Sequence, residues 1–530
     1  MLRRSPSKRV LLFQVYPVWR GVQSDMRLPV GMLYLAGSLK RAGYDVSVFH
    51  VQDEHVDEML SSLDLHDILF VGVCSVLTGF SLRSAIAFSR KVKAIKSTLP
   101  IVWGGVQPTA ISEVCLREEF VDAVGMGDGE DVIVEIAHML NGDMEPKDVK
   151  SLAFRDENGK IIVNPRRDIT KELDEYEPDF SLIDLNRYIF DGRITGLLMT
   201  SRGCPFACTF CYNDYFSKRR WRKHSADFVV NTVQALRQKY YFHTISVSDD
   251  LFIVDRKRAI DIIERLHAIG IRVFGVDVKT NFMGEEEIKA LARAEVESVF
   301  FGLETLQPRL LANMKKEQTN EDVVVMLQRF ARLAPKVMLQ TGILMALPYE
   351  RPSEIRSDIR AGLDLYRHNP NLSVYFGTLF PLPGTAMMDA ARLNGFDPKT
   401  VYDYADIDLN TAWDLCGQWT LFEPTRRDRE ILRLTEKYSQ LAGIPMMINN
   451  IVVATTKDRL CVLLFRLLFA VAVVRLRHGL FFLHAFDFKA YDGIWKLYQW
   501  HPKLYFKSFW KSVKPKSTPP SDLSASPQSP

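Results

Sequence analysis

GCPFACTFCYN, residues 203–213, contains Cys204, Cys208 and Cys211 within eight residues. The other four of the seven cysteines are scattered along the chain. Disulfide-bonded cysteines would be spread out and paired, and an odd number grouped in this way indicates a reducing compartment. Three thiols at Cys-x3-Cys-x2-Cys spacing on one tight loop are typical of ligands for a single metal centre.

The number of ligands narrows the choice of metal centre. A closed zinc site or a fully ligated iron–sulfur cubane uses four ligands, and the nearest histidine, His224, lies beyond a basic run. The pattern therefore predicts a [4Fe-4S] cluster in which the cysteines hold three irons and one iron is open for chemistry. A zinc loop with a distant fourth ligand and a coincidental spacing are the alternatives.

The loop also resembles a known signature. Cys-x3-Cys-x2-Cys with the aromatic Phe210 before the last cysteine is similar to the motif of the radical S-adenosylmethionine (SAM) enzymes. The resemblance implies that Cys204, Cys208 and Cys211 ligate the cluster, whose open iron binds the amino and carboxylate groups of SAM. An electron from the cluster would cleave SAM to a 5′-deoxyadenosyl radical, and Phe210 would pack on the adenine.

Length and composition set broad limits. A chain of 530 residues predicts about three domains. Hydrophobic residues make up 47% and charged residues 25% of the sequence, as in an ordinary globular protein. The net charge of +4 indicates no particular partner. We expect no cleaved signal peptide, because the basic N-terminus leads directly into a strand, and a cytoplasmic location also suits an oxygen-sensitive cluster.

Residues 1–145 alternate short apolar runs with helical patterns. This alternation predicts a doubly wound, Rossmann-like parallel sheet, which would bind a ligand at the carboxyl ends of its strands. The expected strands are residues 9–15, 44–51, 68–74, 101–103 and 123–126, and the expected helices are residues 30–42, 82–96 and 131–140.

This half resembles the cobalamin (B12)-binding domain that is often fused ahead of radical SAM domains. Ser75 and Leu77 after the third strand, and Gly104 and Gly105 after the fourth, fall where that family contacts the nucleotide tail of cobalamin. Glycines there would let the backbone approach the ligand closely. No Asp-x-His-x-x-Gly follows the first strand, so the resemblance implies cobalamin bound without a histidine lower ligand. A purely structural Rossmann-like domain is the alternative.

Residues 146–190 are predicted to form a connector with a small hairpin around Asn158-Gly159. Residues 191–400 repeat strand and helix, with polar residues at the strand ends, where α/β barrels keep their chemistry. The cluster loop follows the first strand, as in the radical SAM barrel, and six strands predict a partial (β/α)6 barrel. The expected strands are residues 197–200, 243–247, 273–278, 298–301, 337–346 and 373–379.

The resemblance assigns further residues to SAM. Asp249 and Asp250, after the second strand, sit where family members contact the SAM amino group. Glu304 resembles a polar residue near the ribose, and Ile343 lies on a strand similar to the one that binds adenine. For each carboxylate, a helix cap or a salt bridge is the structural alternative. The basic run 218–223 is expected to hold an acidic group or to be a solvated loop.

The C-terminal part is unusual. Residues 401–455 are predicted to be helical, residues 456–516 form an apolar and basic amphipathic segment, and residues 517–530 are expected to be disordered. Residues 489–516 carry seven lysines and one aspartate among many aromatic residues. Neither apolar run reaches the roughly 20 residues of a membrane span. The combination is typical of a segment lying on a bilayer surface, and helices packed on the barrel or in a dimer are the alternative.

The two resemblances imply a cobalamin-associated radical SAM enzyme that functionalises an unactivated carbon. Methylcobalamin would donate a methyl group to the substrate radical, and the C-terminal segment favours a lipophilic substrate. We expect a flavodoxin- or ferredoxin-like electron donor, a peripheral contact with the inner membrane face and no nucleic acid. No catalytic side chain is predicted, because the difficult chemistry belongs to the cofactors.

Two other functions stay open at this point. One is a radical SAM oxidoreductase or cyclase that does not use cobalamin. The other is a non-catalytic, membrane-associated protein that binds an iron–sulfur cluster or a corrinoid.

Overall fold

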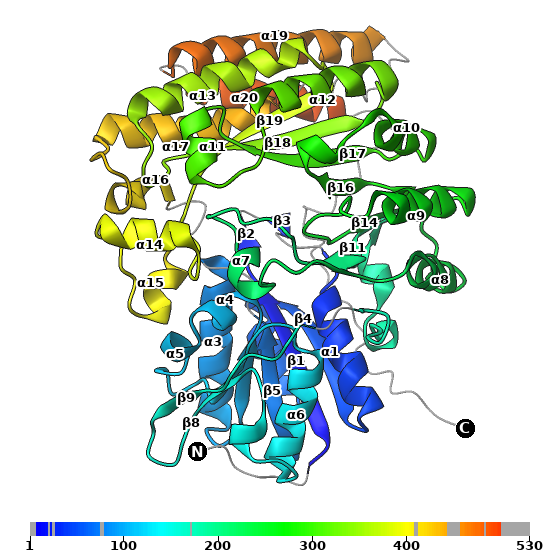
Figure 1. Cartoon of the computed structure of the whole chain (residues 1–530), viewed down its shortest axis with the longest axis vertical. Coiled ribbons are helices and arrows are strands. Elements are labelled where there is room, and N and C mark those ends of the chain that lie inside the picture. Colours follow the sequence, from blue (N-terminus) through cyan, green and yellow to red (C-terminus); the bar gives the residue numbers. More distant parts are fainter. Residues whose placement is uncertain are drawn as a thin grey trace.

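The computed structural model describes residues 7–19, 22–23, 27–74, 79–169, 172–407, 412–442, 456–481 and 484–499. Two α/β halves are stacked end to end, and a layer of C-terminal helices covers the far side of the second half (Figure 1). The N-terminal half lies at the bottom of this view, and the barrel half lies above it.

The N-terminal half is built on a seven-stranded sheet with the order β4-β1-β5-β6-β7-β8-β9. The first five strands of that order are parallel, which confirms the predicted doubly wound sheet. Helices α1 and α6 contact each other on one face, and α3 packs against β1. The elements are β1 (Arg9–Tyr16), α1 (Val30–Arg41), β4 (Asp45–Gln52), α2 (Val56–Ser62), β5 (Ile68–Cys74), α3 (Phe80–Ile95), β6 (Ile101–Gly104), α4 (Val106–Ala110), α5 (Ser112–Cys115), β7 (Ala123–Gly125) and α6 (Glu130–Asn141).

The hairpin expected in the connector is also a part of this sheet. Strands β8 (Leu152–Arg155) and β9 (Ile161–Val163) form an antiparallel pair. Strand β8 continues the sheet by pairing antiparallel with β7. The polypeptide therefore leaves the N-terminal sheet only after Val163.

The second half contains two four-stranded sheets. They provide six parallel strand positions, because β10 is antiparallel to β11 and because β15 and β16 occupy one position. The first sheet is β10-β11-β14-β15 and the second is β16-β17-β18-β19, with Phe274 between β15 and β16. The predicted partial barrel is thus confirmed, and every predicted barrel strand is present with ends shifted by a few residues. The strands are β10 (Ile189–Phe190), β11 (Arg193–Leu198), β14 (Thr244–Val247), β15 (Arg272–Val273), β16 (Gly275–Val278), β17 (Ser298–Glu304), β18 (Met338–Met345) and β19 (Leu372–Thr378).

Amphipathic helices cover the outside of the barrel. The longer ones bury an apolar face, and several begin with a side-chain cap; at α12, for example, Thr319 and Asp322 form a reciprocal capping box. The helices are α7 (Asn213–Phe216), α8 (Ala226–Arg237), α9 (Arg256–Ala268), α10 (Glu285–Arg293), α11 (Pro308–Asn313), α12 (Asn320–Leu333), α13 (Pro352–Asp364), α14 (Ala386–Leu393), α15 (Val401–Ala405) and α16 (Ala412–Leu415).

Three long helices form the C-terminal layer: α17 (Arg426–Ala442), α19 (Thr456–His478) and α20 (His484–Gln499). Helix α17 packs on β19, and α19 packs on α13, α17 and α20. Buried Arg475 pairs with Asp487 and joins α19 to α20. None of the helices among the described residues has both the length and the apolar character needed to cross a bilayer. The predicted disordered tail, 517–530, and the basic aromatic sequence beyond residue 499 lie outside the described residues.

Candidate active site

The cluster loop is held at both ends by a two-residue ladder. Strand β12 (Ser201–Arg202) precedes the loop and pairs antiparallel with β13 (Arg222–Lys223), which follows it. Gly203 turns the chain out of the ladder with φ 81°. A Cβ at this position would overlap the carbonyl oxygen of Arg220. Glycine is therefore required at the entry to the loop, both for its dihedral angle and for space.

The three cysteine thiols are free and half-buried on this loop. Burial raises the pKa of each, that of Cys211 to about 12, and neighbouring thiols further raise the pKa of Cys204 and Cys211. Lys316 lowers the pKa of Cys208, and Lys279 acts in the same direction on Cys204 and Cys208. Because metal ligands must be thiolates, a positively charged metal centre would favour loss of the protons from all three thiols.

The donor set fits an iron–sulfur cluster better than a single ion. Among the described residues, no three His, Cys, Asp or Glu side chains converge tightly enough to hold one metal ion. In a [4Fe-4S] cluster each cysteine binds a different iron at a corner of the cube, so its ligands stand further apart. Three thiolates with two nearby lysines match this larger centre, and Cys204, Cys208 and Cys211 would hold it.

The two aspartates after β14 bind the cluster loop. Asp249 accepts hydrogen bonds from the Thr200 amide, the Thr200 hydroxyl and the Ser201 hydroxyl, each at 2.6 Å. Asp250 accepts from the Gly203 amide at 2.8 Å and from the Tyr212 hydroxyl. Both carboxylates thus position the chain on either side of Cys204, and their contact with SAM stays a prediction.

Glu304 occupies an uncommon backbone conformation at the end of β17, with φ 67°. Its carboxylate lies 2.9 Å from the ammonium of Lys316, and both side chains are largely buried. Lys316 also lies 5.8 Å from the centre of the Phe210 ring. The pair therefore lies next to the cluster loop, which suits a contact with SAM. Sequence reasoning missed Lys316, because it lies in a loop of unremarkable composition.

Phe210 and Ile343 have different surroundings. Phe210 packs on a small apolar cluster that includes Met314 and Leu347. Ile343 is fully buried, and its side chain points at Gly362 of α13, away from the barrel interior. The side chain of Ile343 is therefore part of the packing between β18 and α13, and its contact with SAM stays a prediction.

The barrel interior has open space above its strands. A Cβ at Gly342 of β18 or at Gly377 of β19 would meet no atom within 4 Å. On β16, Asp277 alternates with the buried Val276 and Val278 and so faces this interior. The Asp277 side chain is open to this space, but desolvation inside the barrel and the nearby Asp249 still raise its pKa to about 7. The polar position within an otherwise apolar strand was the signal that could have identified Asp277 in the sequence.

Glu350 was also missed. Its carboxylate is buried in the turn after β18 and accepts a hydrogen bond from the Leu347 amide at 3.1 Å. Burial raises the pKa of Glu350 to about 8. The residue holds the turn after β18 in place, so it supports the rim of the barrel.

The carboxyl edge of the N-terminal sheet presents a different kind of site. Gly104 ends β6, and Gly105 follows with φ 108°, a conformation that favours glycine. The next helix buries Gln107, whose Nε2 has no hydrogen-bond partner within the described part of the chain. A glycine cradle and an unused amide donor fit a large ligand with acceptor groups, such as cobalamin. Ser75 and Leu77 lie outside the described residues.

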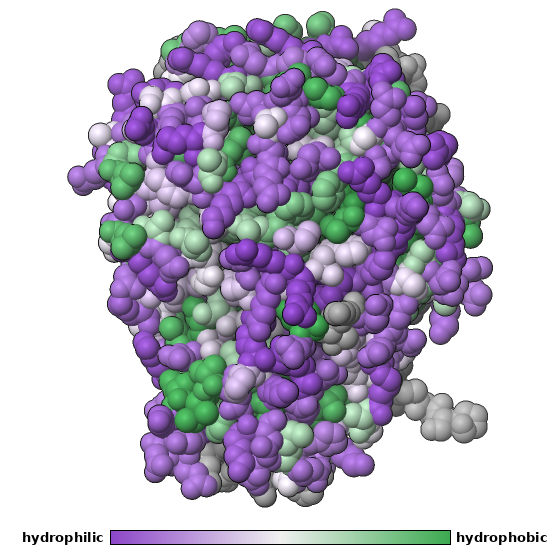
Figure 2. Space-filling view, in the orientation of Figure 1, coloured by the Kyte–Doolittle hydropathy of each residue, from purple (hydrophilic) through white to green (hydrophobic). Residues whose placement is uncertain are grey.

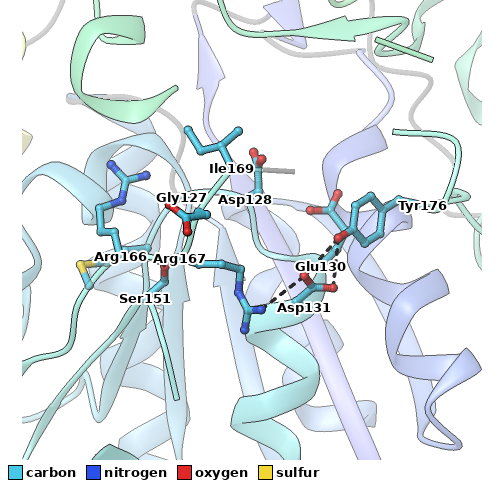
Figure 3. Close-up of a pocket in the computed structure, with 11 residues that line it drawn as sticks. Gly127, Asp128, Glu130, Asp131, Ser151, Arg166, Arg167, Ile169 and Tyr176 are labelled. Atoms are coloured by element: carbon cyan, nitrogen blue, oxygen red, sulfur yellow. Dashed lines mark hydrogen bonds and ion pairs between the residues drawn. The ribbon is translucent and has the colours of Figure 1, made fainter. Parts of the chain in front are cut away.

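A small cavity opens beside this edge, at the end of β7 (Figure 3). Its volume of about 20 Å³ is room for little more than one water molecule. Arg166, Asp128 and Tyr176 are among its lining residues. The cavity is therefore a narrow gap between packed chain segments and not the cobalamin pocket.

The two candidate cofactor segments touch each other. Helix α7, which follows Cys211, contacts α4, which follows Gly105. The Tyr215 hydroxyl donates to the carbonyl oxygen of Val106 at 3.3 Å. Figure 1 shows α7 between the two halves, close to α4. The cluster loop and the glycine edge therefore border the same space.

The basic run after the cluster loop divides in two. Lys218, Arg219 and Arg220 are exposed, whereas Arg222 is buried. Lys223 pairs with Asp255 at 2.6 Å. The run is therefore partly a solvated loop and partly a structural strand.

Two family models match the chain. The radical SAM superfamily model matches residues 198–361, and the B12-binding domain model matches residues 25–137. The chain is 29% identical over 374 residues to the uncharacterized methyltransferase PH0819 of Pyrococcus horikoshii, covering 69% of this chain and 79% of that protein. It is 23% identical to the anaerobic magnesium-protoporphyrin IX monomethyl ester cyclase of Cereibacter sphaeroides, covering 72% of this chain and 63% of that protein.

Solved structures show the same fold. The radical SAM methyltransferase TsrM from Kitasatospora setae, with tryptophan substrate and a SAM analogue bound, superposes with a TM-score of 0.61. It is 17% identical and covers 73% of this chain and 77% of its own. The cysteine loop, the six-stranded barrel and the preceding parallel sheet thus agree with both family models. The chain thus contains a B12-binding domain, residues 25–137, followed by a radical SAM domain, residues 198–361.

Proposed function

We propose that the protein is a cobalamin-dependent radical SAM methyltransferase that adds a methyl group to an unactivated carbon. The contact between α7 and α4 carries this proposal, because it brings the loop for the cluster and the glycine edge for cobalamin to one shared space. A methyl donor and a radical generator must both reach the same substrate carbon.

When bound, the cluster with SAM supplies a radical that removes a hydrogen atom, and methylcobalamin supplies the methyl group. Asp250 holds the first turn of the cluster loop, and the pair of Glu304 and Lys316 offers polar contacts for SAM. The open positions at Gly342 and Gly377 leave room for the substrate. Asp277 faces this room and can bind a hydrogen-bond donor of the substrate.

The products of SAM turnover test the reaction. The reconstituted holoenzyme is incubated anaerobically with SAM labelled in its methyl group, a reductant and fractionated small-molecule extract. We expect S-adenosylhomocysteine and 5′-deoxyadenosine to form together, with label in a carbon–methyl product. Formation of 5′-deoxyadenosine alone would contradict methyl transfer and support a cyclase or oxidoreductase.

We also propose that a flavodoxin- or ferredoxin-like protein delivers the electron. The exposed Lys218, Arg219 and Arg220 lie beside the cluster loop and would attract an acidic partner. Reversing these three charges should slow reduction by flavodoxin about tenfold and leave reduction by dithionite unchanged. Equal slowing with both reductants would contradict a docking role.

A third proposal is that the C-terminal layer rests on an anionic membrane surface. Helix α19 exposes Leu460, Leu463, Leu467, Val471 and Val474, which are 40–56% exposed and spaced along one face. Its opposite face packs on the protein. This face lies along the top rim of the molecule, where Figure 2 shows apolar side chains between polar ones. The lysine-rich sequence that follows α20 supplies complementary charge for anionic lipids.

Vesicle sedimentation tests this contact. Wild-type protein should bind vesicles containing anionic lipid, and a Leu463→Asp, Leu467→Asp variant should bind about tenfold more weakly. A Leu393→Asp variant is the control, because Leu393 is exposed on α14 elsewhere. A dimer in solution that the double variant dissociates would show that a second copy, and not a membrane, covers this face.

A further inference from the structure

Four charged side chains, three of them buried and one partly exposed, lie together where the two halves meet. Asp128 and Glu130 follow β7 in the N-terminal half, and Arg202 and Arg222 form the ladder that brackets the cluster loop. Arg202 Nη2 lies 2.6 Å from Glu130 Oε1, and Arg202 Nη1 lies 3.9 Å from Asp128 Oδ1. Arg222 pairs with Asp128. We name these four residues the interdomain latch.

The surroundings of Arg202 fix its direction. Its guanidinium stacks over the Tyr34 ring at 4.7 Å, and the Tyr34 hydroxyl lies 3.0 Å from His224 Nε2. His224 Nδ1 in turn lies 3.0 Å from Asp174. Helix α1, the connector and the chain after β13 thus support the same arginine. An arginine held in this way by aromatic stacking and an ion pair has little freedom to move.

The latch is poorly suited to a purely stabilising role. The side chains of Arg202, Glu130 and Arg222 are at most 10% exposed, so their desolvation is costly. The Nε groups of Arg202 and Arg222 have no hydrogen-bond partner within the described residues. Apolar side chains of similar volume are often equally stable at such positions. A functional role therefore explains these buried charges better than a contribution to stability does.

The position of the latch suggests what it does. Arg202 is followed directly by Gly203 and the cluster ligand Cys204. Glu130 begins α6 beside β7, which pairs with β6 and its Gly104. A second contact accompanies the latch: Arg166 donates hydrogen bonds to the carbonyl oxygens of Tyr215 and Phe216 in α7. Figure 3 shows Asp128, Glu130 and Arg166 around the small cavity at the end of β7.

We propose that Arg202 and Glu130 are positioning residues that set the cluster loop at a fixed separation from the cobalamin edge. This inference rests on the proposed function of the two sites. A misplacement of about 1 Å between reacting groups costs up to about a hundredfold in rate. The latch would therefore govern how many SAM cleavages end in methyl transfer, without touching either cofactor.

Three variants separate positioning from stability. Arg202→Met removes the partner of the buried Glu130, and Glu130→Met leaves Arg202 with only the more distant Asp128. The double variant replaces both charges with apolar side chains. The exposed pair of Arg293 and Glu264, altered as Glu264→Met, is the control. Thermal unfolding, iron content and hydroxocobalamin affinity are measured for each protein. We expect the singles to unfold at lower temperature, and the double variant to unfold near wild type with both cofactors bound.

The decisive measurements report how the cluster site and the cobalamin site are placed relative to each other. In the double variant we expect a weaker magnetic interaction between the reduced cluster and cob(II)alamin, and about tenfold more 5′-deoxyadenosine per S-adenosylhomocysteine. Without cofactors, limited proteolysis should cut the connector between residues 164 and 190 faster than in the control. Wild-type values in the double variant would overturn the proposal, and so would loss of either cofactor. Proteolysis and magnetic interaction need no methyl transfer, so they distinguish failure of the latch from failure of the proposed reaction.

Discussion

The two halves of the molecule build their candidate sites from different kinds of groups. Both place their candidate site at the carboxyl ends of parallel strands. The barrel supplies specific ligands there, with three thiols and two lysines around one loop. The N-terminal sheet supplies backbone and space, with Gly104, Gly105 and the Gln107 Nε2, which has no partner among the described residues. A cluster must be built by bonds to the protein, whereas a preformed macrocycle only has to be accommodated.

This difference predicts that the two candidate sites respond differently to substitution. The barrel site should fail completely when one ligand is lost. The N-terminal site should weaken gradually as its space is filled. Four experiments test that contrast, in order of decreasing effect.

Removal of one ligand should have the largest effect. In Cys208→Ala we expect the iron content to fall far below the about four irons per chain of the wild type, with SAM cleavage reduced by at least about a thousandfold. The readout is iron and sulfide analysis after anaerobic reconstitution. Cys416→Ala is the matched control, because Cys416 is a buried thiol outside the loop. A full cluster in Cys208→Ala would contradict the ligand assignment.

Filling the entry to the cluster loop should have the next largest effect. Gly203→Ala must adopt a positive φ and overlap the Arg220 carbonyl, so we expect a loss of more than about 2 kcal/mol in unfolding free energy. Gly43→Ala shares the positive φ but meets no atom within 4 Å, and should lose only about 1 kcal/mol. Denaturant unfolding compares the two. Equal losses would show that the overlap is relieved at no cost.

The N-terminal edge should respond more mildly. A Cβ at Gly104 would make only an ordinary contact, 3.7 Å from the carbonyl oxygen of Gly125, so Gly104→Ala should fold. We expect it to bind hydroxocobalamin about tenfold more weakly, equivalent to about 1.4 kcal/mol, and to retain its cluster. Absorbance titration measures the affinity. Unchanged affinity would place the corrinoid elsewhere.

The smallest effect concerns pH. The pKa of Glu350 is raised from its ordinary 4.5 to about 8 by burial. Between these values the folded state binds more protons than the unfolded state, so this contribution to stability is lost as pH rises through about 8. Glu350→Gln should flatten the fall of melting temperature between pH 6 and pH 8.5 by about 2 °C.

The N-terminal half offers the opposite case. Burial lowers the pKa of His50 to about 3, so its contribution grows as pH rises from about 3 to about 6.5. His50→Gln should therefore change the acid side of the melting profile and leave the alkaline side intact. Identical profiles for the Glu350 and His50 variants would contradict this separation.

Much of the fold could be predicted from the sequence, because it rests on local patterns. The apolar run that becomes β17 and the turn glycines that end strands are visible in the sequence without a structure. The cysteine loop was predictable for the same reason, since its three ligands lie within eight residues. Family resemblance then located Glu304 and the glycine edge.

The contacts that the sequence did not reveal are long-range. The pairing of Arg202 with Glu130 joins residues from different halves, and neither sits in a pattern that names its partner. Lys316 reaches Glu304 from the loop after α11. The direction of Ile343 depended on which face of β18 meets α13, and both faces of that strand are apolar enough to be buried. Such choices are made by tertiary packing and not by local preference.

The pairing of β8 with β7 has a practical consequence for dissecting the protein. A fragment ending at residue 145 would leave the backbone of β7 unpaired along one side. An open edge of this kind invites the strands of other chains and leads to aggregation. A fragment that runs to residue 169 would keep β8 and β9 and cover that edge with its own hairpin. The longer fragment is therefore the one expected to remain monodisperse and to report corrinoid binding in isolation.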